Sequence, residues 1–144
     1  MSTDVRTRLH KNVRHLGSDE VFDALLPGAA NVHGELAARG LRVKGLPPLG
    51  LSVDGRSVTL SASDGGLAMR SGIDHAGVVA TLDGSALSDL VQDVQSTMGL
   101  AMTGRVKITT GSVNDWIAWE PVLRALLDGR KVHESGDVTF VDLD

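Results

Sequence analysis

The spacing of hydrophobic residues changes along the chain and predicts a helix, then several strands, then alternating helix and strand. From Phe22 to Ala37 apolar residues recur every three or four positions, as on one face of a helix. Between residues 49 and 82 they alternate, with the period of two that strands have. Helical spacing returns after Asp83, and one more alternating segment interrupts it at 105–109. The pattern therefore predicts an α+β domain.

The first helical segment carries its own start and stop signals. Ser18 is predicted as its N-cap, and Gly40 as the residue just beyond its end. Pro27 lies within the apolar stripe and is expected to kink the helix or to begin a second one.

Tight turns separate the predicted strands. Asp54-Gly55 is a strong hairpin signal, and a second turn is expected at 63–66. The segment 76–82 is almost continuously apolar, which favours a central strand covered on both faces. The five predicted strands lie at 49–53, 58–62, 67–69, 76–82 and 105–109.

The second half is predicted to hold two helices. Ser85 is expected to cap the first, whose stripe includes Leu87, Leu90, Val91 and Val94, and 97–103 is expected to be an apolar link. Ser112 and Asp115 form a capping box before the last helix, which should bend or restart at Pro121 and end at Gly129. The segment 137–144 alternates like a short strand or a tail.

Charge and composition limit the class of protein. The 144 residues suit a single domain, predicted as 18–144 after a basic N-terminal extension at 1–17. Residues 1–16 carry a net charge of +3, which leaves −7 on the rest, so a general nucleic-acid partner is not expected. Residues 5–16 form either an amphipathic helix for transient contact with a membrane surface or a docked terminal helix. The absence of cysteine and of a signal peptide fits a cytoplasmic protein, and the Ala, Gly, Val, Asp and Arg bias is typical of a GC-rich bacterial genome.

Two segments carry a resemblance to the sterol carrier protein type 2 family. Val78-Val-Ala-Thr-Leu-Asp-Gly-Ser-Ala-Leu-Ser-Asp-Leu90 resembles that family's apolar strand followed by a Leu-x-x-Leu helix. Met98-Gly-Leu-Ala-Met-Thr-Gly-Arg-Val-Lys-Ile-Thr-Thr-Gly111 resembles its loose signature of small and apolar residues before Gly-[Lys/Arg]-[Leu/Val]-Lys-[Ile/Val]. A coarser similarity extends over about residues 18–128.

The resemblance implies a five-stranded, mostly antiparallel sheet with helices over one face and a tunnel between them. Its expected ligand is a fatty acyl chain, a phospholipid or a sterol, bound without chemistry. The chain departs from the family in its basic extension, in Trp116 and Trp119 where aliphatic residues are common, and in its C-terminal end. These departures leave open a filled core and a role as an interaction or dimerisation module beside an enzyme.

The candidate ligand-binding residues are apolar side chains expected on the inward sides of their elements. Methionine suits variable apolar shapes because it is flexible and polarisable, although a filled core explains the same pattern. Arg70, Arg105 and Lys107 are candidates to orient a headgroup, or else solvated charges at the strand edges. The predicted lining is Met69, Leu90, Val94, Met98, Met102, Trp116 and Ile117.

No catalytic, metal or cofactor site is predicted. The chain has no cysteine nucleophile, no Gly-x-Ser-x-Gly elbow and no phosphate-binding Gly-x-x-x-x-Gly-Lys loop. Its five histidines do not share a spacing with carboxylates that would converge on a metal. We therefore expect a binding protein for an apolar small molecule, acting alone, as a homodimer or beside a partner enzyme, and not an enzyme.

Overall fold

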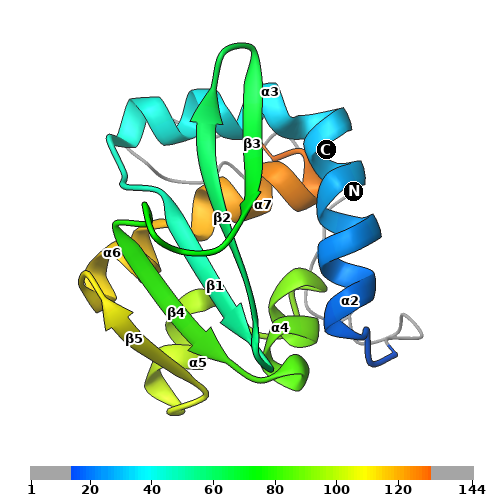
Figure 1. The fold of residues 1–144 in the computed structure, drawn as a ribbon, viewed down its shortest axis with the longest axis vertical. Coiled ribbons are helices and arrows are strands. Elements are labelled where there is room, and N and C mark those ends of the chain that lie inside the picture. The colour runs from blue at the N-terminus through cyan, green and yellow to red at the C-terminus, as the bar shows by residue number, and fades with distance from the viewer. Residues whose placement is uncertain (1–13, 131–144) are drawn as a thin grey trace.

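A computed structural model describes residues 14–130, in which one five-stranded sheet has helices over one face (Figure 1). None of the helices in this range is long and apolar enough to cross a bilayer. The helical segments are α2 (Ser18–Glu20), the π-helical η1 (Val21–Leu25), α3 (Leu26–Lys44), α4 (Gly84–Val91), α5 (Thr97–Met102), α6 (Val113–Ala118) and α7 (Glu120–Asp128). The strands are β1 (Leu49–Val53), β2 (Arg56–Ser63), β3 (Gly66–Ser71), β4 (Val78–Leu82) and β5 (Val106–Thr110).

The sheet has the order β3-β2-β1-β4-β5, and its only parallel pair within the described chain is β1 with β4. The predicted α+β class and mostly antiparallel sheet are therefore confirmed. Asp54 and Gly55 join β1 to β2 with φ of 51° and 85°. Positive φ at both central residues is the mark of a type I′ turn, whose twist matches that of the flanking strands.

Alternation along the strands gives the sheet one apolar and one polar face. The apolar face carries the buried residues Leu49, Leu51, Val53, Val58, Leu60, Val78, Ala80 and Leu82, and the helices cover it. The opposite face, called the outer face below, carries hydroxyl and charged residues such as Thr59, Arg70 and Lys107. β4 is interior to the sheet as predicted, but Thr81 is exposed on the outer face, so the prediction that β4 is covered on both faces was only partly right.

The connection between β3 and β4 crosses the outer face, in front of β1 and β2 in Figure 1. Gly50 makes this close approach possible, since an added Cβ would lie 2.8 Å from Ile73 Cγ2 and 2.9 Å from Ala76 Cβ. The Gly77 amide anchors the end of the connection by donating to the Pro48 carbonyl at 3.0 Å. The segment 72–77 therefore stands as a wall on an otherwise open face.

Predictions for the first helix need two corrections. Gly17, not Ser18, is the N-cap, and no side chain caps this end. The helix continues past Gly40 to Lys44, because the next turn buries Leu41, and it ends at Gly45 with φ of 63°. The restart expected at Pro27 is confirmed, since α3 begins at Leu26 with the proline in its first turn, directly after the π-helical turn η1.

Caps in the second half also differ from prediction. Asp83, not Ser85, caps α4, since its carboxylate accepts from the Ala86 amide at 2.8 Å. Residues 97–102, predicted as a link, form the helix α5 with Ser96 as its N-cap. The cap at Ser112 is confirmed, and so are the restart at Pro121 and the left-handed end at Gly129.

One continuous core lies between the helices and the sheet. Its largest members, Trp116, Trp119 and Phe22, are almost fully buried. Leu16 joins the same core, and its amide donates to Ser88 Oγ at 2.9 Å. The predictions for 5–13 and 137–144 lie outside the described residues.

Candidate functional site

The seven predicted lining residues fall into three environments. Leu90 and Trp116 are buried in the core, and Met69 and Ile117 are partly buried against it. The other three are exposed: Val94 by 49%, Met98 by 50% and Met102 by 79%. Their predicted inward orientation is therefore wrong for Val94, Met98 and Met102, while a role of the set in ligand binding stays a prediction.

The local backbone explains these exposed positions. Because 97–102 is a helix, Thr97 and Leu100 share the inward face and leave Met98 and Met102 on a second face, four residues apart. Val94 falls off the stripe of α4 because that helix ends at Val91, and Asp93 then turns the chain with φ of 59°. The sequence pattern gave no sign of this left-handed residue, since Asp93 also fits the wet face of a longer helix.

Together these residues make an apolar surface, called the α5 edge below. α5 contacts α4, α6 and β5, and several partly buried apolar side chains on α5, α6 and β5 pack against the core. Met98 and Met102 are the largest of the exposed apolar side chains at the α5 edge. The exposed members of the edge are Val94, Met98, Met102 and Val113, and its partly buried members are Ala101, Val106, Ile108 and Ile117.

The two tryptophans fix α5 and α6 to the core. The Trp116 indole donates to the Thr97 carbonyl at 2.8 Å, and the Trp119 indole donates to the Pro47 carbonyl at 2.9 Å. Both side chains are fully buried. They therefore fill the interior and present no surface to a partner, which removes them as support for an interaction module.

A buried guanidinium links α7 to the turn after α4. Arg124 is 1% exposed, and its nitrogens lie 3.3 Å from Glu120 and Asp128 and 3.6 Å from Asp93. It also donates to the Leu90 carbonyl. Sequence analysis missed this cluster, although the i, i+4 spacing of residues 120, 124 and 128 was its visible signal.

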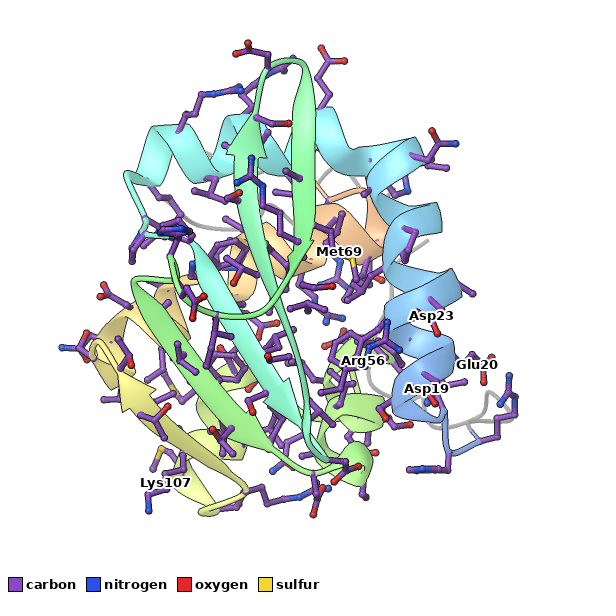
Figure 2. The ribbon with its side chains drawn as sticks, viewed as in Figure 1. Asp19, Glu20, Asp23, Arg56, Met69 and Lys107 are labelled. Atoms are coloured by element: carbon purple, nitrogen blue, oxygen red, sulfur yellow. The ribbon has the colours of Figure 1, made fainter. Side chains whose placement is uncertain are left out.

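A second cluster joins the N-terminal helix to the β1–β2 hairpin (Figure 2). Arg56 pairs with Asp19 at 3.0 Å and with Asp23, and its guanidinium lies 5.3 Å from the centre of the Phe22 ring. The hydrogen bond from Arg56 holds the pKa of Asp23 below its ordinary value and raises the pKa of Arg56. The pKa of Glu20 is lowered in the same way by Arg14.

The three predicted headgroup cations do not converge on the helix-covered face. Arg105 is held by Asp89 at 2.8 Å and by Gln95 at 2.6 Å. Arg70 and Lys107 lie on the outer face instead, as the strand register shows. They therefore do not reach the space between sheet and helices.

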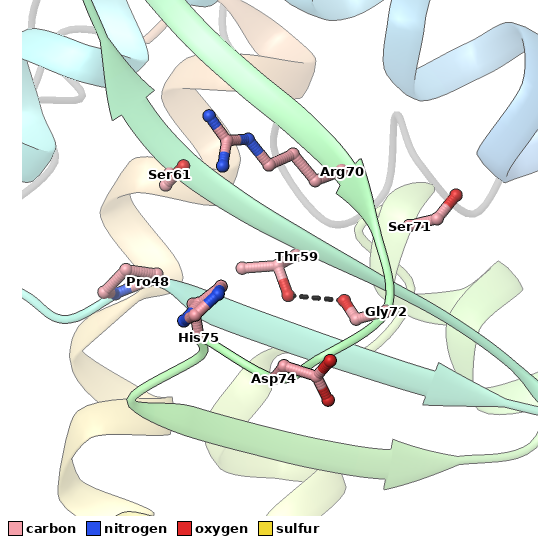
Figure 3. A pocket seen from close by; sticks show the side chains of 8 residues that line it. All are labelled: Pro48, Thr59, Ser61, Arg70, Ser71, Gly72, Asp74 and His75. Atoms are coloured by element: carbon pink, nitrogen blue, oxygen red, sulfur yellow. Dashed lines mark hydrogen bonds between the residues drawn. The ribbon is translucent and has the colours of Figure 1, made fainter.

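The outer face carries a small open cavity of about 120 Å³, lined mostly by residues with polar side chains (Figure 3). β2 forms its floor, β3 one wall, and the segment 72–77 the other. The Thr59 hydroxyl donates to the Gly72 carbonyl at 2.6 Å and fixes this wall to the floor. Sequence analysis missed the cavity because Arg70 and His75 have no distinctive spacing, and only the fold places them together.

Comparison with solved structures shows the architecture to be a known one. Sterol carrier protein 2 from Yarrowia lipolytica, in its apo form, superposes with a TM-score of 0.62 at 20% identity, covering 82% of this chain and 99% of that one. UbiJ-SCP2, a ubiquinone synthesis protein, superposes with a TM-score of 0.52 at 15% identity, covering 72% of this chain and 96% of that one. This chain has the sterol carrier protein 2 fold.

The same sterol carrier protein 2 fold also occurs within a much longer protein. In the sec-alkylsulfatase Pisa1 from Pseudomonas sp. the match has a TM-score of 0.50 at 17% identity and covers 71% of this chain but only 16% of that one. No protein-family model matches the chain, and no curated protein matches it in sequence. The resemblance found in the sequence is thus confirmed at the level of the fold.

Proposed function

We propose that this chain binds an apolar ligand, such as a fatty acyl chain, a phospholipid or a sterol, between α5 and β5 and performs no chemistry on it. The observation that carries the proposal is the α5 edge, where exposed methionines lie on a helix that contacts elements with partly buried apolar side chains. The sterol carrier fold supports it, since UbiJ-SCP2 and the yeast carrier share the architecture.

Physical chemistry favours a chain-like ligand at this edge. Each buried CH₂ group contributes about 0.8 kcal/mol, so an acyl chain gains affinity by length without a specific polar contact. Met98 and Met102 adapt to such a chain because their side chains are unbranched and polarisable. A shift of α5 away from β5 would extend the apolar path to Ala101, Ile108 and Ile117.

A fluorescent fatty acid titrated into the full chain tests the proposal. We expect saturable binding that unlabelled oleate displaces, and at least a tenfold loss of affinity in Met98→Glu and Met102→Glu, equivalent to about 1.4 kcal/mol. Val32→Glu is the matched control, since Val32 is 72% exposed on α3, at the opposite end of the molecule from α5 in Figure 1. Absence of saturable binding, or an equal loss in Val32→Glu, contradicts the proposal.

The second candidate is an interaction or dimerisation module that uses the α5 edge as its contact surface. The exposed apolar side chains at Met98, Met102 and Val113 favour it, since contiguous apolar surface marks sites of protein contact. Light scattering of the purified chain separates the two functions. A dimer that Met102→Glu converts to a monomer, together with no fatty-acid binding, favours this second function.

A further inference from the structure

We propose that the outer-face cavity is a binding site for a phosphate group, separate from the apolar ligand site. It lies on the side of the sheet opposite to the helices, between β2, β3 and the segment 72–77. The proposal does not depend on the proposed function, because the two sites share no residue.

Arg70 supplies the positive charge. It makes no ion pair with any of residues 14–130. By contrast, the arginines Arg56, Arg105 and Arg124 are each paired with a carboxylate. Arg70 stands opposite Thr59 in the β2–β3 register, so its exposed side chain lies on the outer face, at the edge strand β3. An arginine without a carboxylate partner, placed at a concave surface, is well suited to bind an oxyanion.

Two further donors line the same cavity. Ser61 lies on the outer face one pleat along from Thr59, so it is a diagonal neighbour of Arg70 across the two strands. Its hydroxyl has no partner among the described residues. His75 comes from the opposite wall, and Figure 3 shows it on the far side of the cavity floor from Arg70.

The geometry favours phosphate over a planar carboxylate. The guanidinium of Arg70, the hydroxyl of Ser61 and the imidazole of His75 approach from three separate segments, which suits an anion whose oxygens point in several directions. A volume of about 120 Å³ is large enough for one such group. The Thr59 hydroxyl is already committed to Gly72, so it acts as floor and not as a donor.

Asp74 opposes binding and provides a sharp test. Its carboxylate lies across the cavity from Arg70 in Figure 3, with Thr59 and His75 between them. It repels an anion in the cavity and lowers the affinity, so Asp74→Asn should bind phosphate more tightly. A gain of affinity on removal of a carboxylate is a result that damage to the fold does not produce.

Titration of the ¹⁵N-labelled full chain with inorganic phosphate at constant ionic strength, against chloride, measures binding. We expect saturable shifts of the amides of Gly72 and His75, at least tenfold weaker binding in Arg70→Gln, and severalfold tighter binding in Asp74→Asn. Lys107→Gln is the matched control, since Lys107 is an exposed cation on the same face that does not line the cavity. Linear shifts, or an Arg70→Gln variant that behaves like Lys107→Gln, overturn the proposal.

Two further probes distinguish the sources of the phosphate group. Binding of glycerol 3-phosphate indicates a free phosphate ester, whereas Arg70-dependent binding of phosphatidic acid vesicles alone indicates a lipid headgroup; if neither binds but inorganic phosphate does so saturably, the site takes the free ion. Met98→Glu should bind phosphate normally, and Arg70→Gln should bind the fatty acid normally. The failure of one proposal is thereby distinguished from the failure of the other.

Discussion

Replacing Arg124 by alanine tests whether one buried guanidinium holds α7 against the turn after α4. The side chain is almost fully buried, and it contacts carboxylates from α7 and from Asp93 as well as the Leu90 carbonyl. Its removal leaves three carboxylates close together and takes one of two donors from the Leu90 carbonyl, which keeps the Asp93 amide at 3.2 Å. Each of these changes destabilises the folded state.

The structure sets the size of the effect. Loss of one partner of a fully buried ion pair costs about 3–5 kcal/mol. The three carboxylates here are 17–30% exposed, and Arg130 still lies 3.4 Å from Asp93 and 3.7 Å from Asp128. We therefore expect a loss near the lower end, about 3 kcal/mol, which corresponds to a fall in Tm of about 10 °C for a domain of this size.

Urea denaturation followed by tryptophan fluorescence measures this loss, since Trp116 and Trp119 are buried in the folded chain. Arg124→Met should lose less than Arg124→Ala, because methionine keeps part of the packing. Arg14→Ala is the control, since its pair with Glu20 is exposed and should matter little. If Arg124→Ala stays within about 0.5 kcal/mol of the unmodified chain, the reasoning about this cluster is refuted.

Three more predictions concern packing and pH. Gly111→Ala should cost more than about 2 kcal/mol in urea denaturation, because Gly111 has φ of 79° and an added Cβ would lie 2.5 Å from a backbone oxygen; a neutral result contradicts the packing. Trp119→Phe should cost about 2 kcal/mol, because it takes the indole donor from the partly buried Pro47 carbonyl and shrinks a fully buried side chain, and unchanged stability would exclude that role. NMR titration should find the pKa of Asp23 below 3.8 and restored to that value in Arg56→Gln. Because folding lowers the pKa of Asp23, the pairing with Arg56 stabilises the folded chain above the pKa that Asp23 has in the unfolded chain, and this stabilisation is lost as pH falls below about 4. An Asp23 pKa that Arg56→Gln leaves unchanged refutes the pairing.

Short-range pattern was enough to predict most strands and turns. The alternation at 49–53 and the Asp54-Gly55 turn appear in the structure as predicted, because strand period and turn chemistry depend on neighbouring residues. Helix ends were less accurate. α3 continues past Gly40 because Leu41 is buried in the next turn, and the chain leaves the helical path after α4 because Asp93 has a positive φ. Both effects depend on tertiary packing and not on the neighbouring residues from which the helix ends were predicted.

By itself the sequence determined the α+β class, the order of the strands and of every described helix except α5, and the resemblance that the fold comparison confirms. Only the tertiary structure decided which apolar side chains are exposed to solvent and which polar side chains line the same cavity. Met98 and Met102 are exposed because α5 turns Thr97 and Leu100 inward, and Arg70 and His75 line one cavity because the segment 72–77 folds over Gly50. Hydrophobic spacing reports the period of an element but not its neighbours, whereas a surface or a cavity is made by elements that are distant in the chain.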